Sequence, residues 1–439
     1  MRLRLTPPNT EAFEADYTGQ ADSDLAKRLT NLVQAIEGSA TILIDGGWGV
    51  GKTTFALRWQ HLLKDGGIAT VYLNAFGLDY VETPFVALSG AIVDAADSGN
   101  AKGARPRERF VAAASKIGRS IAVVSAKMAV RAATFGIADV SDFEALKDVA
   151  SDPLSDAAGD ATKEAISSHR QRKREIDDLK EALAELASAQ DCGKLVIIVD
   201  ELDRCRPDFA LGLLEITKHF FGSTGVVFVL VSNLRQLEAS VLHQYGEKTE
   251  AHEYLRRFYD LRVDFTLDYR DRHDTKLRAI IQRLGSGLIA EGDNQTYCID
   301  YMTQIARAYR LSLRDVENIF TNLAISYAVD ARRYRPAILV CFLSTLKLLD
   351  PIAYKKAKIR ELTYIEVQSF IDERDWKDFD TEKLKKLLRW HLDPTVDISD
   401  PEFREYGSGQ WQLDRHEVIP HLVNSVIDLF EVPSMQELR

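Results

Sequence analysis

The sequence predicts an α/β fold in which a parallel sheet forms the core, a helical insert interrupts the core and a helical region follows it. Strand, glycine-rich loop, helix and strand patterns succeed one another over residues 40–73, the order of a parallel crossover unit. Two later runs, Leu195–Val199 and Val226–Val231, are wholly apolar, as strands buried on both faces of a parallel sheet are. Residues after Tyr269 carry helical patterns only.

Residues 1–97 are expected to hold an N-terminal helix and the first part of the core. Ser23 is suited to cap a helix over Ser23–Ile36, whose leucines recur at helical spacing. An apolar, β-rich run then enters the glycine-rich loop. The elements expected here are a strand at Ala40–Ile44, a helix at Thr53–Lys64, a strand at Ile68–Leu73 and a helix at Pro84–Ala96.

Residues 98–175 are predicted to form the helical insert, because alanine and serine become abundant there and the sheet pattern disappears. The insert ends in the basic run His169–Arg174. The second part of the core covers residues 176–268. Its further elements are a helix over Ile176–Leu186, a helix at Pro207–Phe221 and a strand at Leu261–Phe265.

Two helical regions are predicted to complete the chain, a lid-like region at 269–335 and a C-terminal region at 336–439. Proline lacks the N–H that a helix interior needs, so prolines predict helix breaks. These breaks are expected at Pro336, Pro351, Pro394, Pro401 and Pro420.

Composition limits the protein class. The 439 residues carry a formal net charge of −10, with 46% hydrophobic and 28% charged residues. That mix excludes collagen-like, wholly disordered and disulfide-scaffold chains, and the four cysteines form no CxxC zinc pair. The stretch Val111–Val140 contains too many charges to span a membrane, and no apolar run of signal-peptide length opens the chain. We therefore expect a cytoplasmic protein without a transmembrane helix.

A phosphate-binding loop lies between the first strand and the helix after it. The run from Gly46 to Thr53 matches GxxxxGK[ST] in full, which predicts a P-loop NTPase core with this loop as its Walker A motif. Its backbone N–H groups can surround a phosphate at a helix N-terminus. Lys52 is expected to reach the β- and γ-phosphates, and the Thr53 hydroxyl to bind Mg²⁺. The predicted nucleotide contacts are Gly46, Gly47, Trp48, Gly49, Val50, Gly51, Lys52, Thr53 and Thr54, with Trp48 expected to pack against the protein rather than stack on a base.

An acidic pair, the predicted Walker B motif, follows the second buried strand. Asp200 and Glu201 fall at the C-terminal edge of the sheet, where α/β proteins gather ligands. Asp200 is the expected Mg²⁺ partner, held through water or Thr53. Glu201 is placed to orient or deprotonate a water that attacks the γ-phosphate. Nucleotide kinases exclude water and lack this glutamate, so the pair favours hydrolysis. Asp203 and Arg204 are expected to brace the turn as an ion pair, with a catalytic role as the alternative.

Three further residues are candidates to sense the γ-phosphate. Asn233 follows the strand Val226–Val231 and is a candidate to hold the attacking water, or else caps a helix. Arg257, with Arg256 as its rival, lies where AAA+-like enzymes often place an arginine that reaches a neighbouring subunit's γ-phosphate. The alternative for both arginines is a solvated or ion-paired helix face. Arg314 is a candidate nucleotide contact from the lid-like region.

Three segments together resemble the KAP family of P-loop NTPases, over roughly residues 20–330. They are Gly46–Phe55, the Leu-Asn-Ala-Phe of 73–76 and the Val-Asp-Glu-Leu-Asp-Arg-Cys of 199–205. The resemblance implies an AAA+/STAND-like enzyme of the additional-strand class, with a catalytic glutamate and with ATP and Mg²⁺ as cofactors. Family members are thought to act as ATP-driven switches, and bacterial members are often linked to phage exclusion.

The chain departs from the family pattern in three places. Phe76 stands where the family often has tryptophan, and Asn233 stands where it usually has aspartate. Many members carry transmembrane helices between the two Walker motifs, whereas the insert here is charged and rich in alanine. We therefore expect at most a peripheral contact with a membrane.

Three functions are compatible with these patterns. The favoured one is an ATPase switch in anti-phage defence that signals to a partner effector and assembles as a homo-oligomer through a trans arginine. The second is a nucleic-acid-stimulated motor or loader that uses the basic runs His169–Arg174 and Tyr269–Arg278. The acidic net charge disfavours nucleic acid, and a solvated helix face explains both runs. The third is a scaffold that binds nucleotide without turnover, which the intact Lys52, Asp200 and Glu201 argue against.

Overall fold

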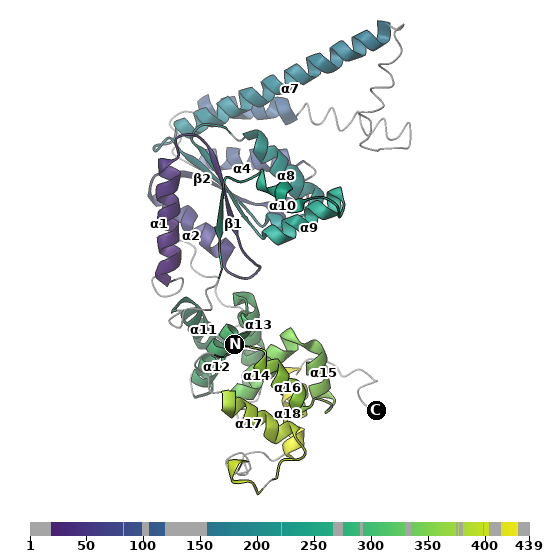
Figure 1. Cartoon of the computed structure of the whole chain (residues 1–439). Helices are drawn as coiled ribbons and strands as arrows, with labels where there is room; N and C mark the ends of the chain where they lie inside the picture. Colours follow the sequence, from purple (N-terminus) through teal and green to yellow (C-terminus); the bar gives the residue numbers. More distant parts are fainter. Residues whose placement is uncertain are drawn as a thin grey trace. The chain divides into compact units, whose positions relative to one another are not determined.

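The structure is a computed structural model that divides into two compact units. One unit contains Asp24–Gly46 and Lys52–Phe265, and the other contains the chain up to Ser23, the loop Gly47–Gly51 and the chain from Thr266 onward. Figure 1 labels the elements of both units. The structure describes residues 19–81, 83–98, 105–118, 156–220, 222–266, 275–289, 293–329, 336–374, 376, 381–397, 399–403 and 414–428.

Five parallel strands form the sheet of the first unit, in the order β2-β3-β4-β1-β5. This arrangement confirms the predicted parallel α/β core. β3 and β4 are buried along their whole length, which explains why their sequences are uninterrupted apolar runs. The strands are β1 (Ala40–Asp45), β2 (Ala69–Asn74), β3 (Leu195–Asp200), β4 (Val226–Ser232) and β5 (Leu261–Asp264).

Helices cover both faces of the sheet. On one face lie α1 (Gly19–Ala35) and α2 (Lys52–Asp65), which are joined where Trp59 Nε1 donates to Thr30 Oγ1 at 3.0 Å. On the other face, α4 (Pro84–Ser98), α7 (Asp156–Ser188) and α8 (Pro207–Phe220) share one apolar core with the alternate strand residues Val71 and Ile197. Shorter elements complete the unit: α3 (Ala75–Leu78), a 3₁₀ turn at Leu202–Arg204, α9 (Leu234–Tyr245) and α10 (Ala251–Arg256).

The insert joins the core through one long helix. α7 runs without a break through the expected boundary at 175/176, so the change in composition there is not a structural boundary. A helix over 105–118 packs Phe110 into the same core, and its Arg109 pairs with Glu181 and Glu185 of α7. Residues 119–155, which include most of Val111–Val140, lie outside the described residues. No described helix is long and apolar enough to cross a membrane.

The C-terminal unit is helical, as predicted. Its helices share one apolar core that extends across the expected boundary at 335/336, so the lid-like and C-terminal regions pack as one body. The expected break at Pro420 is wrong, because this proline lies in the first turn of its helix, where its missing N–H removes no helical hydrogen bond. The helices are α11 (Thr275–Leu288), α12 (Asp293–Tyr309), α13 (Leu313–Val329), α14 (Ala337–Leu349), α15 (Pro351–Lys358), α16 (Tyr364–Asp372), α17 (Thr381–Leu392) and α18 (Val418–Leu422).

Candidate nucleotide-binding site

The glycine-rich loop has a backbone that requires glycine. Gly49 and Gly51 have φ angles of +76° and +94°, a region that residues with a Cβ rarely adopt. The loop residues 47–51 group with the C-terminal unit, in which the Leu313 N–H donates to the Gly49 carbonyl at 3.0 Å. A Cβ placed on Gly49 would lie 2.9 Å from Cβ of Arg314, so the predicted Arg314 lies beside the loop. Trp48 is 48% exposed, so about half of its surface is buried, and its packing role stays a prediction.

Lys52 is fixed close to the start of its helix. Its ammonium donates to the Gly46 carbonyl at 2.5 Å, and the residue is only 9% exposed. Burial lowers the pKa of Lys52 below its ordinary value of 10.5, since desolvation penalises the charged form, while the nearby carboxylates of Asp203 and Asp200 act in the opposite direction. The ammonium is therefore placed where an anionic phosphate would stabilise its charge.

Thr53 and Asp200, the predicted Mg²⁺ pair, are hydrogen-bonded to each other. Asp200 is 1% exposed and also accepts from Tyr72 Oη at 2.8 Å and from the Glu201 N–H at 2.7 Å. Burial raises the pKa of Asp200, and these three hydrogen bonds partly offset that effect. A hydroxyl and a carboxylate are hard oxygen donors of the kind that hold Mg²⁺ together with nucleotide phosphates. The residues present therefore fit this cation.

Glu201 has both of its carboxylate oxygens engaged. Oε1 lies 2.7 Å from a guanidinium nitrogen of Arg204, and Oε2 accepts from Asn74 Nδ2 at 3.1 Å. The Glu201 backbone is left-handed, with φ +60° and ψ 28°, which is uncommon for a residue with a Cβ. Arg204 thus braces the turn through Glu201, whereas Asp203 accepts from Ser232 Oγ at 3.2 Å. The expected pairing of Asp203 with Arg204 is replaced by these two contacts.

Asn74 contacts the acidic pair, and the sequence analysis gave it no role in the site. Its carbonyl Oδ1 caps α3 by accepting from the Gly77 N–H at 2.8 Å, which leaves Nδ2 for Glu201. The register of β2 against β3 puts Asn74 opposite Asp200, at the same carboxyl edge of the sheet. The segment Leu-Asn-Ala-Phe contained the signal, but no sequence rule showed which residue the asparagine would meet.

Asn233 occupies the N-cap position of α9 but does not act as a cap. Its side chain makes no cap hydrogen bond. Instead, Asp45 at the end of β1 accepts from the Leu234 N–H at 2.8 Å, and its other oxygen pairs with Arg262 of β5 at 2.9 Å. The capping alternative for Asn233 is therefore wrong. Asp45 was not singled out from the sequence.

The comparisons with known proteins identify the family. The KAP family P-loop domain matches residues 23–329. The chain belongs to the KAP family. No curated protein matches it. Among solved structures, this KAP chain is similar to the Aeropyrum pernix ORC2 protein in ADPNP–ADP complexes, at 13% identity and a TM-score of 0.39 over 97% of each chain.

The two arginines at the end of α10 lie on the surface of the KAP domain. The guanidinium of Arg257 lies 5.0 Å from the ring centre of Tyr254, a cation–π distance. Arg256 is exposed and has no ion pair or hydrogen bond within the described part of the chain. Neither arginine contacts the acidic pair of its own chain in the described interactions, so a role in a neighbouring subunit stays a prediction.

The site of this KAP protein gathers at the carboxyl ends of three adjacent strands. β1 leads into the loop and Lys52, β3 ends in Asp200 and Glu201, and β4 ends next to Asn233. Such an edge, with a glycine-rich loop and a helix N-terminus, binds phosphate groups. The chain is thus a nucleotide-binding P-loop NTPase of the KAP family.

Proposed function

We propose that this KAP protein binds ATP with Mg²⁺, hydrolyses the γ-phosphate and uses its nucleotide state as a switch. The observation that carries the proposal is the juxtaposition of two functional groups on one turn. The Thr53–Asp200 pair is suited to Mg²⁺, and the next residue, Glu201, supplies a carboxylate beside it. A metal-competent pair with an adjacent base favours hydrolysis over nucleotide storage.

In this mechanism each residue has one task. Lys52 and the loop N–H groups bind the β- and γ-phosphates, and Thr53 and Asp200 hold Mg²⁺, which when bound neutralises phosphate charge. Glu201 accepts a proton from the attacking water, which Asn233 helps to orient. Because Asn74 and Arg204 engage both oxygens of Glu201, the carboxylate must leave at least one of them before it can accept that proton. The protein can therefore control turnover through the breaking of these contacts.

The direct test measures ADP release from Mg-ATP by the purified chain, with Glu201→Gln as the matched variant. Glutamine keeps the size of the side chain but accepts no proton, so we expect nucleotide binding to persist. Turnover should fall by roughly 10²–10⁴, the usual scale for the loss of a general base. Binding without turnover by the unmodified chain would instead support the scaffold function. Hydrolysis by Glu201→Gln at the unmodified rate would remove Glu201 from the mechanism.

The finer aspects of the switch rest on the family resemblance. We propose a homo-oligomer in which Arg257 reaches a neighbouring γ-phosphate, a partner effector that receives the signal, and a role in anti-phage defence. Plaque counts on bacteria that carry the intact gene or its Lys52→Ala form test the defence role. Equal plaque numbers on both strains and on an empty-vector strain would contradict it.

A nucleic-acid motor is the second candidate, because one described feature favours it. Arg170, Lys173 and Arg174 are exposed along α7. DNA or RNA added to the ADP-release assay separates the two functions. A rate increase that disappears when these three residues become glutamine would favour the motor, whereas an unchanged rate would favour the switch.

A further inference from the structure

The two edges of the sheet differ in chemistry. β5 forms one edge, and its Arg262 pairs with Asp264 and Asp45 at 2.9 Å each. Charged residues of this kind are what proteins use to keep an edge from pairing with another chain. β2 forms the other edge, and its sequence Ala-Thr-Val-Tyr-Leu-Asn contains neither charge nor proline. Within the described residues, no strand pairs with its outer side.

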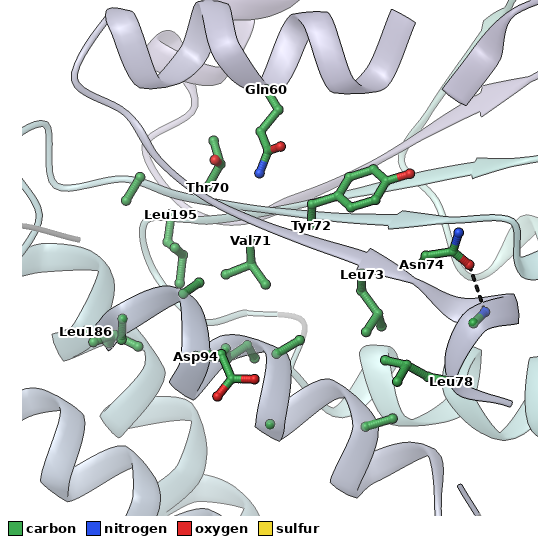
Figure 2. A pocket seen from close by; sticks show the side chains of 18 of the residues that line it. Gln60, Thr70, Val71, Tyr72, Leu73, Asn74, Leu78, Asp94, Leu186 and Leu195 are labelled. Carbon is green, nitrogen blue, oxygen red and sulfur yellow. Dashed lines mark hydrogen bonds between the residues drawn. The ribbon is translucent and has the colours of Figure 1, made fainter. Parts of the chain in front are cut away.

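A cavity of about 990 Å³ follows this edge of the described sheet (Figure 2). Figure 2 shows Thr70 and Tyr72 on the side of β2 that faces α2, and Val71 and Leu73 on the side that faces α4. The cavity thus lies along the strand and reaches both of its faces. From the flanking helices it is lined by Gln60 and Lys64 of α2 and by Val86, Ala87, Gly90 and Ala91 of α4.

One wall of the cavity carries polar groups. Gln60 is 8% exposed, and the buried Thr70 hydroxyl has no hydrogen-bond partner among the described residues. Buried polar side chains are seldom left unpaired in native structures. In Figure 2, Gln60 extends from its helix on the side of β2 to which Thr70 points. The opposite wall, from α4, is mostly aliphatic, and Asp94 is its one charged residue among those described.

The charge of the lining selects against ionic occupants. Of the described residues that line the cavity, only Lys64 and Asp94 are charged, and their charges are opposite. A nucleotide or a nucleic acid would need a net positive surface. An uncharged occupant matches this balance better. An extended peptide also offers backbone N–H and C=O groups to a strand edge, and its side chains alternate between two faces.

We propose that this cavity binds an uncharged, extended peptide segment of a partner protein, which adds a sixth strand to the sheet along β2. The polar side chains of the segment face Gln60 and Thr70, and its small apolar side chains face α4. Strand addition at an exposed edge is an established mode of peptide recognition, in which backbone hydrogen bonds give affinity and side-chain pockets give specificity. β2 has six residues and offers roughly 20 Å of edge.

The cavity is directly connected to the acidic pair. Tyr72 and Asn74 line it, and their polar ends bond Asp200 at 2.8 Å and Glu201 at 3.1 Å. A strand paired to β2 would restrain Asn74 in the position that holds Glu201. This second part rests on the proposed function: a bound segment slows hydrolysis.

The test uses the full chain and a capped hexapeptide, acetyl-Thr-Val-Thr-Val-Thr-Val-amide, with a neutral fluorophore. Gly90→Leu fills the cavity from α4, and a Cβ at this position meets nothing within 4 Å, so the fold is retained. Gly118→Leu is the matched control, because it lies on a helix outside the cavity lining and its added Cβ is equally free of contacts. A peptide N-methylated at alternate residues keeps the side chains but loses N–H donors.

We expect fluorescence anisotropy to show saturable binding by the unmodified chain and Gly118→Leu, and binding at least tenfold weaker for Gly90→Leu and for the N-methylated peptide. Hydrogen exchange should slow in β2 and not in β5. ADP release should fall at least threefold in the unmodified chain and stay unchanged in Gly90→Leu.

Three results would overturn the docking site: no binding up to 1 mM peptide, equal binding by Gly90→Leu, or equal binding of the N-methylated peptide. Self-association that Gly90→Leu abolishes, without peptide binding, would assign the edge to a second copy instead. Binding and exchange are measured without turnover, so a chain that proves inactive still tests the docking site. Binding with an unchanged hydrolysis rate would overturn only the link to Glu201.

Discussion

Asn74 and Glu201, 127 positions apart in the chain, meet across β2 and β3 with Nδ2 3.1 Å from Oε2. Arg204 pairs with the other carboxylate oxygen, so both oxygens of the proposed general base are engaged. The same asparagine caps α3, so its side chain cannot turn without losing the cap. Release of Glu201 therefore has a structural cost that the protein can use for control.

Asn74→Ala should release Glu201 and raise basal turnover several-fold. The substitution also removes the cap of α3, which should lower the free energy of unfolding by about 1 kcal/mol. Steady-state ADP release and chemical denaturation measure the two effects separately. Asn74→Asp, which keeps a cap acceptor but repels Glu201, is the matched control and should raise turnover with a smaller loss of stability. A lower rate in both variants would mean that Asn74 aligns Glu201 productively.

Lys52→Ala should abolish tight binding of Mg-ATP, because the loop loses the cation expected to contact the β- and γ-phosphates. Titration with a fluorescent ATP analogue measures the affinity. Lys64→Ala removes an exposed lysine at the far end of the same helix and should leave the affinity unchanged. An affinity of Lys52→Ala equal to that of Lys64→Ala would refute the site assignment.

The raised pKa of Asp200 predicts how stability and Mg²⁺-dependent nucleotide binding change with pH. Its raised pKa means that the folded state favours the neutral carboxyl, so this contribution to stability is present at low pH and is lost as pH rises through the folded-state pKa. Mg²⁺ needs the ionised carboxylate, so Mg²⁺-dependent nucleotide binding should weaken at a higher pH than an ordinary aspartate, with a pKa of 3.8, would give.

Asp200→Asn is the control for both pH effects. In the absence of Mg²⁺ and nucleotide, the stability of the unmodified chain relative to Asp200→Asn should fall as pH rises, measured by denaturation across the acidic to neutral range. A difference that grows with pH in favour of the unmodified chain would show that the Asp200 pKa is lowered rather than raised.

Arg257 should act only in an assembly. Specific activity should then rise with protein concentration, and mixing inactive Arg257→Ala with inactive Glu201→Gln should restore part of the turnover, since each subunit lacks a different half of a shared site. Arg256→Ala, its exposed neighbour, should keep its activity alone. A rate that is independent of concentration, with no recovery on mixing, would return both arginines to a solvated helix face.

Local motifs could be predicted from the sequence because their residues are neighbours in the chain. The loop Gly46–Thr53 and the pair Asp200–Glu201 each form within one turn, and their flanking strands have clear apolar patterns. Contacts between strands could not be predicted. Asp45 caps α9 in place of Asn233 only because β1 and β4 are neighbours. The adjacency of Asn74 and Glu201 likewise depends on strand order, which no pattern in either strand specifies.

The ends of helices could likewise be predicted only in part from the sequence. A change in composition near residue 175 suggested the end of the insert, but the backbone hydrogen bonding of α7 continues through it because helix-forming residues occupy both sides. Proline predicted helix breaks from its missing N–H, and the break at Pro351 is confirmed, since α14 ends at Leu349 and α15 begins at Pro351. Pro420 instead lies in the first turn of α18, where that N–H is not needed.

At position 201 the left-handed backbone favours glycine, whereas the proposed hydrolysis needs the glutamate carboxylate. Glycine adopts this conformation without the cost of roughly 1–2 kcal/mol that a Cβ brings. Replacement of Glu201 by glycine should therefore give a protein that is easier to fold, expresses well and cannot turn over. A mutational scan that scores protein abundance and ADP release separately would show the two scores moving in opposite directions at this position. Opposite scores of this kind indicate a residue that is retained for its chemical role although it lowers the stability of the fold.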